Sequence, residues 1–147
     1  MKLGDQPIVN FAGLPINLPV NYRLGVDISH HNASPDWDGF VKAGVSFVYI
    51  KLSEGVGTPD RKAGENARNA ESKNIKIGYY HFCRPDTRNG GTILSDATAE
   101  AAQALGLMQS LPKSRLPLVM DLEDQISWDT KLKRNEYLLW INTFIPV

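Results

Sequence analysis

The sequence predicts an α/β fold built around a parallel sheet. From residue 23 onward, strand and helix signals alternate along the chain four times. The expected strands are continuous apolar runs, as in strands that are covered on both faces. Alternating strands and helices are joined by right-handed crossovers, so neighbouring strands run in the same direction. Such a sheet either stays open or closes into a barrel, and in both cases functional groups gather at the carboxyl ends of the strands.

Four strands are expected. They lie at 24–29, 45–52, 75–82 and 116–124. The last one is the most informative, because its apolar residues lead into Asp121 and Glu123, which are two residues apart and so share one face of the strand. Each carboxylate at the end of a buried strand costs desolvation free energy unless it is paired. We therefore expect these two acids to serve a chemical purpose.

Helices are expected between the strands and after the last one. They should open at 34–35, 58–60, 95–96 and near 129. In the first, Ser34 is the expected N-cap and Pro35 the first helical residue, and Gly44 marks the end. In the third, the apolar side chains recur at spacings of four, four and three from Ala97 to Met108. The fourth helix carries Trp140 toward the end of the chain.

The chain divides into an N-terminal extension, residues 1–22, and a domain, residues 23–147. The extension contains Pro7, Pro15 and Pro19 and shows no sustained periodicity. It also lacks the pattern of a signal peptide. The compartment is therefore left open.

Composition excludes several classes of function. The 16 basic and 16 acidic side chains balance, so neither a nucleic acid nor a charged membrane surface is an expected partner. No segment has the length and hydropathy of a membrane span. The one cysteine, Cys83, excludes an internal disulfide and a multi-cysteine metal site, and it is expected in the core. No cofactor is predicted.

Acidic residues follow three of the four expected strands. Asp27 comes at the end of the first, Glu54 after the second, and Asp121 and Glu123 end the fourth. Parallel strands bring these positions to the same edge of the sheet. Glycoside hydrolysis is the chemistry that most needs such a group of carboxylates. The simpler alternatives are a turn-forming role for Asp27 and structural ion pairs for the others.

Five sequence motifs, in series, resemble glycoside hydrolase family 25, the lysozymes also called the Chalaropsis type. They are Gly25-Val26-Asp27-Ile28-Ser29, Asp36-Trp37, Phe47-Val48-Tyr49-Ile50-Lys51 with Ser53-Glu54-Gly55, Gly78-Tyr79-Tyr80-His81-Phe82, and Leu118-Val119-Met120-Asp121-Leu122-Glu123. The resemblance implies an N-acetylmuramidase that cleaves the β-1,4 bond between N-acetylmuramic acid and N-acetylglucosamine in peptidoglycan. It also implies a TIM-like barrel of an irregular type, with five βα units and three further strands.

The same resemblance implies roles for individual residues. Glu123 matches the general acid, which must hold its proton near neutral pH. Asp121 and Asp27 match aspartates that stabilise positive charge at the sugar or orient its N-acetyl group. Tyr80 is expected in the cleft, and Glu54 beside it in a supporting role. Among the tryptophans, Trp128 is the better candidate for stacking on a sugar.

Other interpretations of these residues stay open. Glu123 could pair with Lys51, and Glu54 could form a structural ion pair. A metal-dependent hydrolase using His30, His31 and His81 is a third possibility, but their spacing does not match a known metal motif.

The family's domain is longer than this chain, which holds only the first four βα units. The missing strands are expected from a C-terminal half or from a homodimer. The alternative function is a catalytically impaired remnant that acts as a peptidoglycan-binding or structural module.

Overall fold

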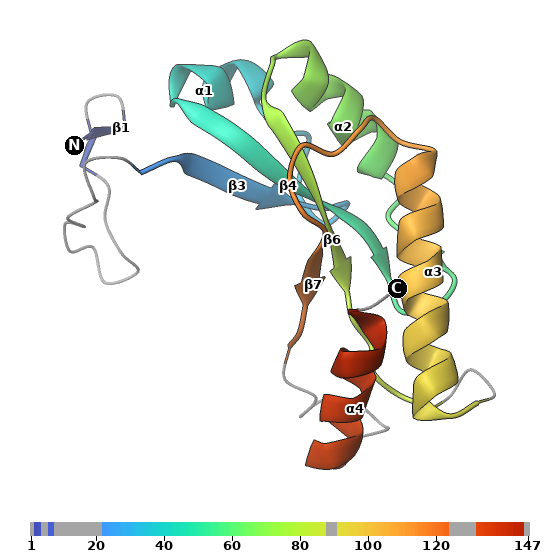
Figure 1. The fold of residues 1–147 in the computed structure, drawn as a ribbon. Coiled ribbons are helices and arrows are strands. Elements are labelled where there is room, and N and C mark those ends of the chain that lie inside the picture. The colour runs from blue at the N-terminus through green and yellow to red at the C-terminus, as the bar shows by residue number, and fades with distance from the viewer. Residues whose placement is uncertain (1, 4–5, 8–21, 88–90, 124–131, 146–147) are drawn as a thin grey trace.

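The structure is a computed structural model, and it describes residues 2–3, 6–7, 22–87, 91–123 and 132–145. Its main sheet is curled and has four parallel strands in the order β3-β4-β6-β7 (Figure 1). Their bounds are β3 (Leu24–Ile28), β4 (Val45–Glu54), β6 (Lys76–Phe82) and β7 (Val119–Asp121). A short fifth strand, β5 (Thr58–Pro59), pairs antiparallel with the end of β4. The predicted α/β class and parallel sheet are confirmed.

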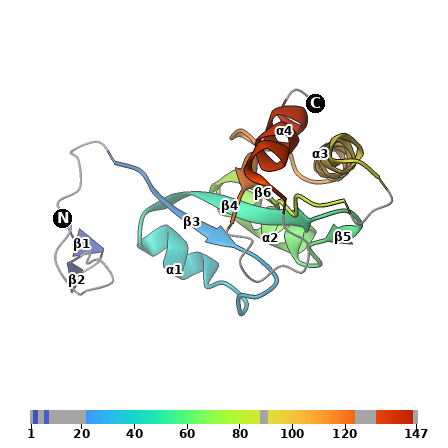
Figure 2. The same ribbon diagram turned by 90° about the horizontal axis from the view of Figure 1, so that it is seen from below.

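Two short strands precede this sheet, within the segment predicted to be an extension. They are β1 (Lys2–Leu3) and β2 (Gln6–Pro7), and they pair with each other in a separate antiparallel sheet. Figure 2 shows this pair at some distance from the main sheet.

In the part of the chain that the structure describes, four helices connect or follow the strands: α1 (Trp37–Lys42), α2 (Ala63–Ser72), α3 (Ile93–Gln109) and α4 (Arg134–Phe144). Helices α1, α2 and α3 contact β4, and α4 packs along α3 (Figures 1 and 2). Within the described residues, no helix is both long and apolar enough to cross a membrane.

The main core lies between one face of the sheet and these helices. Val48, Ile50 and Tyr79 are fully buried there, against the small side chains of Ala67 and Ala70 on α2. Small residues on the helix allow it to approach the sheet closely. The Tyr79 hydroxyl donates a hydrogen bond of 2.7 Å to the carbonyl of Pro112, so its polar end is satisfied.

A second core cluster joins α3 to α4. Trp140 and Phe144 are buried and stack on each other, with ring centroids 5.2 Å apart. The indole N–H of Trp140 donates to the Asp96 carboxylate at 2.8 Å. On α3 the buried stripe runs through Ala97, Ala101 and Ala104. The predicted member Leu105 is 37% exposed instead.

Helix starts differ from the sequence prediction. Helix α1 begins at Trp37 because Asp36, not Ser34, is the N-cap, and its carboxylate accepts from the Gly39 N–H. Helix α3 begins at Ile93, with Thr92 and Ser95 capping each other's backbone. Both true caps lie within a few residues of the predicted ones, which are of the same polar type.

The predicted opening of the second helix at 58–60 is wrong. Thr58 and Pro59 form β5, and the chain reverses before them through Gly55, which has a φ of 51°. The Asp60 carboxylate accepts hydrogen bonds from the His30 backbone N–H at 3.0 Å and lies 2.6 Å from His30 Nδ1. Helix α2 then begins at Ala63. For the fourth helix, the expected start near Asp129 lies outside the described residues.

The predicted buried strand at 116–124 is shorter and more exposed than expected. Strand β7 covers only Val119–Asp121, and Val119 is 38% exposed. It pairs with β6 on one side and is the last strand in the order of the described sheet. An outer strand has one unpaired edge, so its side chains keep more contact with solvent.

Candidate functional site

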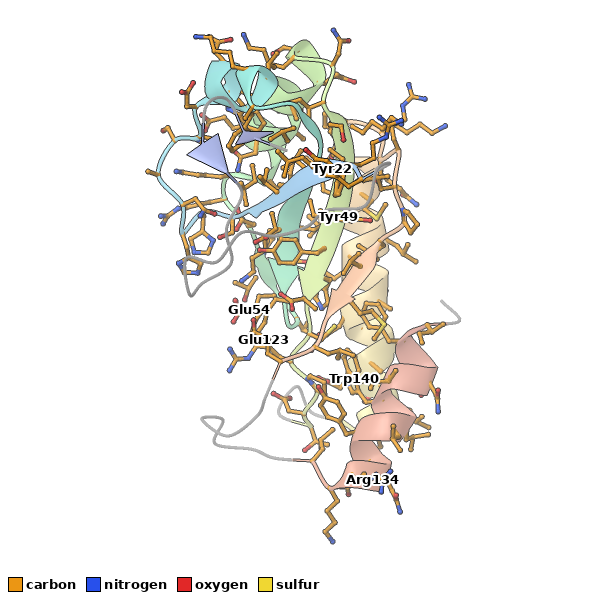
Figure 3. All side chains as sticks on the ribbon, turned by 90° about the vertical axis from the view of Figure 1, so that its left-hand side faces the viewer. Tyr22, Tyr49, Glu54, Glu123, Arg134 and Trp140 are labelled. Carbon is orange, nitrogen blue, oxygen red and sulfur yellow. The ribbon has the colours of Figure 1, made fainter. Side chains whose placement is uncertain are left out.

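An open cavity of about 800 Å³ lies on the sheet face opposite the main core. Its lining contains all five described candidate residues, from all four parallel strands or the segments directly after them: Asp27, Glu54, Tyr80, Asp121 and Glu123. In Figure 3, Tyr49, Glu54 and Glu123 lie one below another along this side of the sheet. The sixth candidate, Trp128, lies outside the described residues.

Strand register explains why most of these side chains share one face. Lys51 on β4 is paired with Tyr80 on β6, and Tyr80 with Val119 on β7. Lys51, Tyr80 and Val119 thus form one row of neighbouring side chains across the sheet. Two residues further along the strands, on the same face, Phe82 is paired with Asp121 and forms the next row. Side chains two residues apart on a strand point to the same face, so the rows stack toward the carboxyl ends.

Glu54 reaches this face only because β4 is irregular. Lys51 and Glu54 are three residues apart, and strict alternation would place them on opposite faces. The pairing of β4 with β6 shifts between Lys51 and Ser53, so Glu54 comes opposite Phe82. A shift of one residue in one strand reverses the facing of the residues that follow. Glu54 and Lys51 therefore line the same cavity.

The candidate acids have different surroundings. Asp27 and Glu123 are exposed, whereas Asp121 and Glu54 are half-buried. Burial raises the pKa of Asp121, and the charges of Glu123 and Asp27 raise it further, against a smaller lowering by Lys51. Asp121 therefore lies close enough to Glu123 and Asp27 to interact with both charges. The exposure of Glu123 departs from the buried strand end that the sequence predicted.

Tyr80, one of two tyrosines in the described lining of the cavity, is held in its neutral form. Burial raises the pKa of Tyr80 to about 12, and the charges of Asp27 and Asp121 contribute to that rise. Near neutral pH its hydroxyl keeps its proton and is able to donate a hydrogen bond. Its neighbour Tyr79 points to the opposite face, as strand alternation requires, and is fully buried.

We predict that Asp121→Asn stabilises the fold in a pH-dependent way. Because folding raises the pKa of Asp121 above 3.8, its contribution to stability is greatest below that value and is lost as pH rises through the raised pKa. Asparagine carries no charge at any pH. The variant should therefore melt at a higher temperature than the wild type at neutral pH. In thermal unfolding, this gain should disappear near pH 3; an equal gain at both pH values would contradict the prediction.

Glu54 is tied into an ion-pair chain. Its Oε2 lies 2.7 Å from Lys51 Nζ, and its Oε1 lies 2.7 Å from Arg84 Nη1. Burial alone would raise the pKa of Glu54, but the hydrogen bonds from Lys51 and Arg84 lower it overall. The sequence left open whether Glu54 belongs to a structural ion pair or to the site. The geometry places it in both.

Gly78 lies directly against the Tyr49 ring, and no larger residue fits there without moving that ring. A Cβ on Gly78 would lie 2.5 Å from Cε1 of Tyr49, whose ring lines the cavity. We expect Gly78→Ala to displace this ring and to cost roughly 1–3 kcal/mol of unfolding free energy, as overpacking does. The matched control is Gly106→Ala in α3, where a Cβ meets no atom within 4 Å. Urea denaturation should show a loss for Gly78→Ala only; equal stability of both variants would refute the prediction.

The three histidines do not converge on one site. His31 lines the cavity, His30 pairs with Asp60, and His81 lies in the core on the other face. His81 Nδ1 is 2.9 Å from Ser53 Oγ, and its Nε2 is 2.7 Å from Glu100 Oε2. The geometry therefore does not support the predicted alternative of a three-histidine metal site.

One buried cluster has ligand types that bind metals. Ligand atoms of His81, Cys83 and Glu100 lie within 4.8 Å of one another. Both nitrogens of His81 already have hydrogen-bond partners, however, and burial raises the pKa of the Cys83 thiol, which keeps it protonated. Cys83 is fully buried, as predicted. We assign this cluster to the core hydrogen-bond network that joins β4, β6 and α3.

Sequence reasoning missed several side chains of the cavity: Ser29, His31, Tyr49, Lys51 and Phe82. Strand alternation could have found Tyr49, Lys51 and Phe82, since they share a face with Asp27 and Tyr80 once the register is known. No signal in the sequence gives that register. Taken together, the cavity offers several carboxylates, a neutral phenol and half-buried aromatic rings, a combination that suits a sugar substrate.

Comparison with known proteins shows which family the chain resembles. The family model described as glycosyl hydrolases family 25 matches residues 26–145. Lysozyme M1 from Streptomyces globisporus is 34% identical over 122 residues, which are 82% of this chain and 40% of that protein. The chain thus spans less than half the length of this curated relative.

Solved structures show the same relationship. A bacterial lysozyme from Streptomyces coelicolor is 31% identical, with a TM-score of 0.66 over 86% of this chain and 57% of that one. The modular autolysin LytC from Streptococcus pneumoniae, solved with a synthetic peptidoglycan ligand, has a TM-score of 0.74. That match covers 97% of this chain and 33% of LytC, and at 19% identity it concerns the fold alone. From the family match and these relatives, the chain belongs to glycosyl hydrolases family 25.

Proposed function

We propose that this protein is a peptidoglycan hydrolase of the muramidase type, cleaving the β-1,4 bond between N-acetylmuramic acid and N-acetylglucosamine. The observation that carries the proposal is the gathering of Asp27, Asp121 and Glu123 in one open cavity with Tyr80. Membership of a family whose relatives include lysozymes gives this group of acids its chemical context.

In this proposal Glu123 is the general acid. It protonates the oxygen of the leaving sugar as the glycosidic bond breaks. Asp121 and Asp27 act as carboxylates, and they stabilise the positive charge that develops at the sugar ring or orient its N-acetyl group. The neutral Tyr80 hydroxyl donates a hydrogen bond to the substrate, and Glu54 holds the cleft in shape.

The fold is consistent with part of a larger closed structure. We propose that β3, β4, β6 and β7 correspond to the first four βα units of the irregular barrel that the family resemblance implies. Their parallel order and the position of the acids at their carboxyl ends support this assignment.

The proposal is tested by the products of digestion. Purified peptidoglycan is incubated with the chain, and the new reducing ends are converted to sugar alcohols with borohydride and analysed by mass spectrometry. A muramidase produces muramitol ends, whereas a glucosaminidase would produce glucosaminitol ends. Absence of new reducing ends would contradict a glycosidase function.

The same preparation tests the alternative, a non-catalytic peptidoglycan-binding module. Sedimentation of insoluble walls with the chain measures binding separately from cleavage. Binding without new reducing ends would favour the impaired module over the enzyme.

A further inference from the structure

We propose that Lys51 is a positioning residue of the cleft, whose buried ammonium group fixes Glu54 and balances the negative charge of Asp121. This inference rests on the proposed function for its catalytic meaning. The contacts of Lys51 carry it, and they can be tested separately.

Lys51 is placed unusually for a lysine. The residue is only 5% exposed, although it lines an open cavity. Lysine is almost never buried to this extent without a partner, because its charge loses hydration. Its partner is Glu54, with 2.7 Å between Nζ and Oε2. Since Arg84 holds the other oxygen of Glu54, the carboxylate is clamped from two sides.

The direction of the Lys51 side chain brings it toward Asp121. Its Nζ lies 4.7 Å from the centroid of the Phe82 ring, in a cation–π contact. Phe82 is the residue paired with Asp121 across β6 and β7. The ammonium group therefore leans from its own row of the sheet toward the row that contains Asp121.

The ionisable groups of the cavity are mainly acidic. They are Asp27 from β3, His31 from the loop after it, Tyr49, Lys51 and Glu54 from β4, Tyr80 from β6, Asp121 from β7, and Glu123 after it. Lys51 is the only lysine or arginine in this lining of described residues. The Asp121 carboxylate is raised in pKa by its burial and by Glu123 and Asp27, and Lys51 opposes that rise.

This arrangement has a consequence for the reaction. A general acid must be protonated while the stabilising carboxylates beside it are ionised. Without Lys51, Asp121 would keep its proton to a higher pH and would lose its charge in the range where the acid works. Lys51 thus widens the pH range in which the two acids have different protonation states.

The direct test is an NMR titration of the Asp121 carboxyl carbon in the 147-residue chain. Lys51→Met keeps the aliphatic stem and removes the charge, and it should move the Asp121 midpoint upward, on the order of one pH unit. Lys51→Arg restores a positive charge and should give a midpoint near that of the wild type. Lys73→Met removes a lysine from an exposed ion pair with Asp38 and should change nothing.

A second pair of variants covers the case in which Lys51→Met does not fold. Glu54→Gln is compared with the double variant Glu54→Gln/Lys51→Met. In the double variant the ion-pair partner of Lys51 is already neutral, so removing the lysine leaves no unpaired carboxylate at position 54. The double variant should show the higher Asp121 midpoint. An unchanged Asp121 midpoint in a folded Lys51→Met protein, or between these two variants, would overturn the proposal.

Activity provides an independent measurement. In Lys51→Met the acidic limb of the kcat/KM profile should move to higher pH, because Asp121 must lose its proton to act. A purely structural role would instead lower kcat/KM by the same factor at every pH, which would contradict the proposal. If the wild type cleaves no peptidoglycan, the proposed function fails, while the titration still decides the role of Lys51.

Discussion

Glu123→Gln is expected to reduce peptidoglycan cleavage by roughly 10²–10⁴-fold, the contribution of a general acid. The amide has nearly the same shape as the carboxyl group, but it has no acidic proton to give to the leaving oxygen. Because Glu123 is exposed, lies after β7 and repels the charge of Asp121, the substitution should not lower the melting temperature. The measurement is the rate of new reducing ends on purified peptidoglycan.

The matched control is Glu65→Gln, which removes an exposed carboxyl on α2, outside the cavity. It should retain full activity. A second substrate separates acid catalysis from binding. An aryl glycoside whose phenolate leaves without a proton should be cleaved with a much smaller loss by Glu123→Gln. Wild-type rates on peptidoglycan, or equal losses on both substrates, would show that Glu123 is not the acid.

His81→Ala is expected to cause the largest loss of stability, about 3–5 kcal/mol, because it empties the space of a fully buried ring and leaves buried polar partners without it. His81 is fully buried and connects Ser53 on β4 with Glu100 on α3. Burial raises the pKa of Glu100, and the hydrogen bond from His81 opposes that rise. In the variant, the Glu100 carboxyl loses its 2.7 Å contact with His81 and still accepts a hydrogen bond of 3.1 Å from the Arg84 backbone N–H.

Urea unfolding followed by tryptophan fluorescence measures this loss. Adding Glu100→Gln to His81→Ala should recover part of the stability, because the group left behind is then neutral. Asp38→Asn, which breaks the exposed pair with Lys73, is the control and should have little effect. A loss below about 1 kcal/mol for His81→Ala, the range of exposed pairs, would contradict a structural role.

The acidic part of the candidate site could be predicted from sequence, because its acids lie at or just after the carboxyl ends of the predicted strands. Asp27, Asp121 and Glu123 needed only strand positions and parallel order to be placed at one edge. Lys51 was not identified as part of the cleft. Its role depends on which residues of β6 and β7 lie beside it, and pairing register is a tertiary property.

Local sequence signals also competed with one another. Thr58, Pro59 and Asp60 are good residues for a helix start, yet Thr58 and Pro59 pair with β4 instead. Asp60 takes hydrogen bonds from His30, which is 30 residues away. A contact of that range leaves no trace in local periodicity, so the helix start was placed too early.

By itself, the sequence determined the alternation of strands and helices, the parallel sheet and the acids at its carboxyl edge. These follow from the spacing of apolar residues, which is local information. Tertiary structure decided which acids face the cavity and what neutralises them. The register shift in β4 brought Glu54 beside Lys51, and Glu123, which follows the last strand of the described sheet, is exposed. Both outcomes depend on how strands pair across the sheet, because pairing sets the facing and the burial of each side chain.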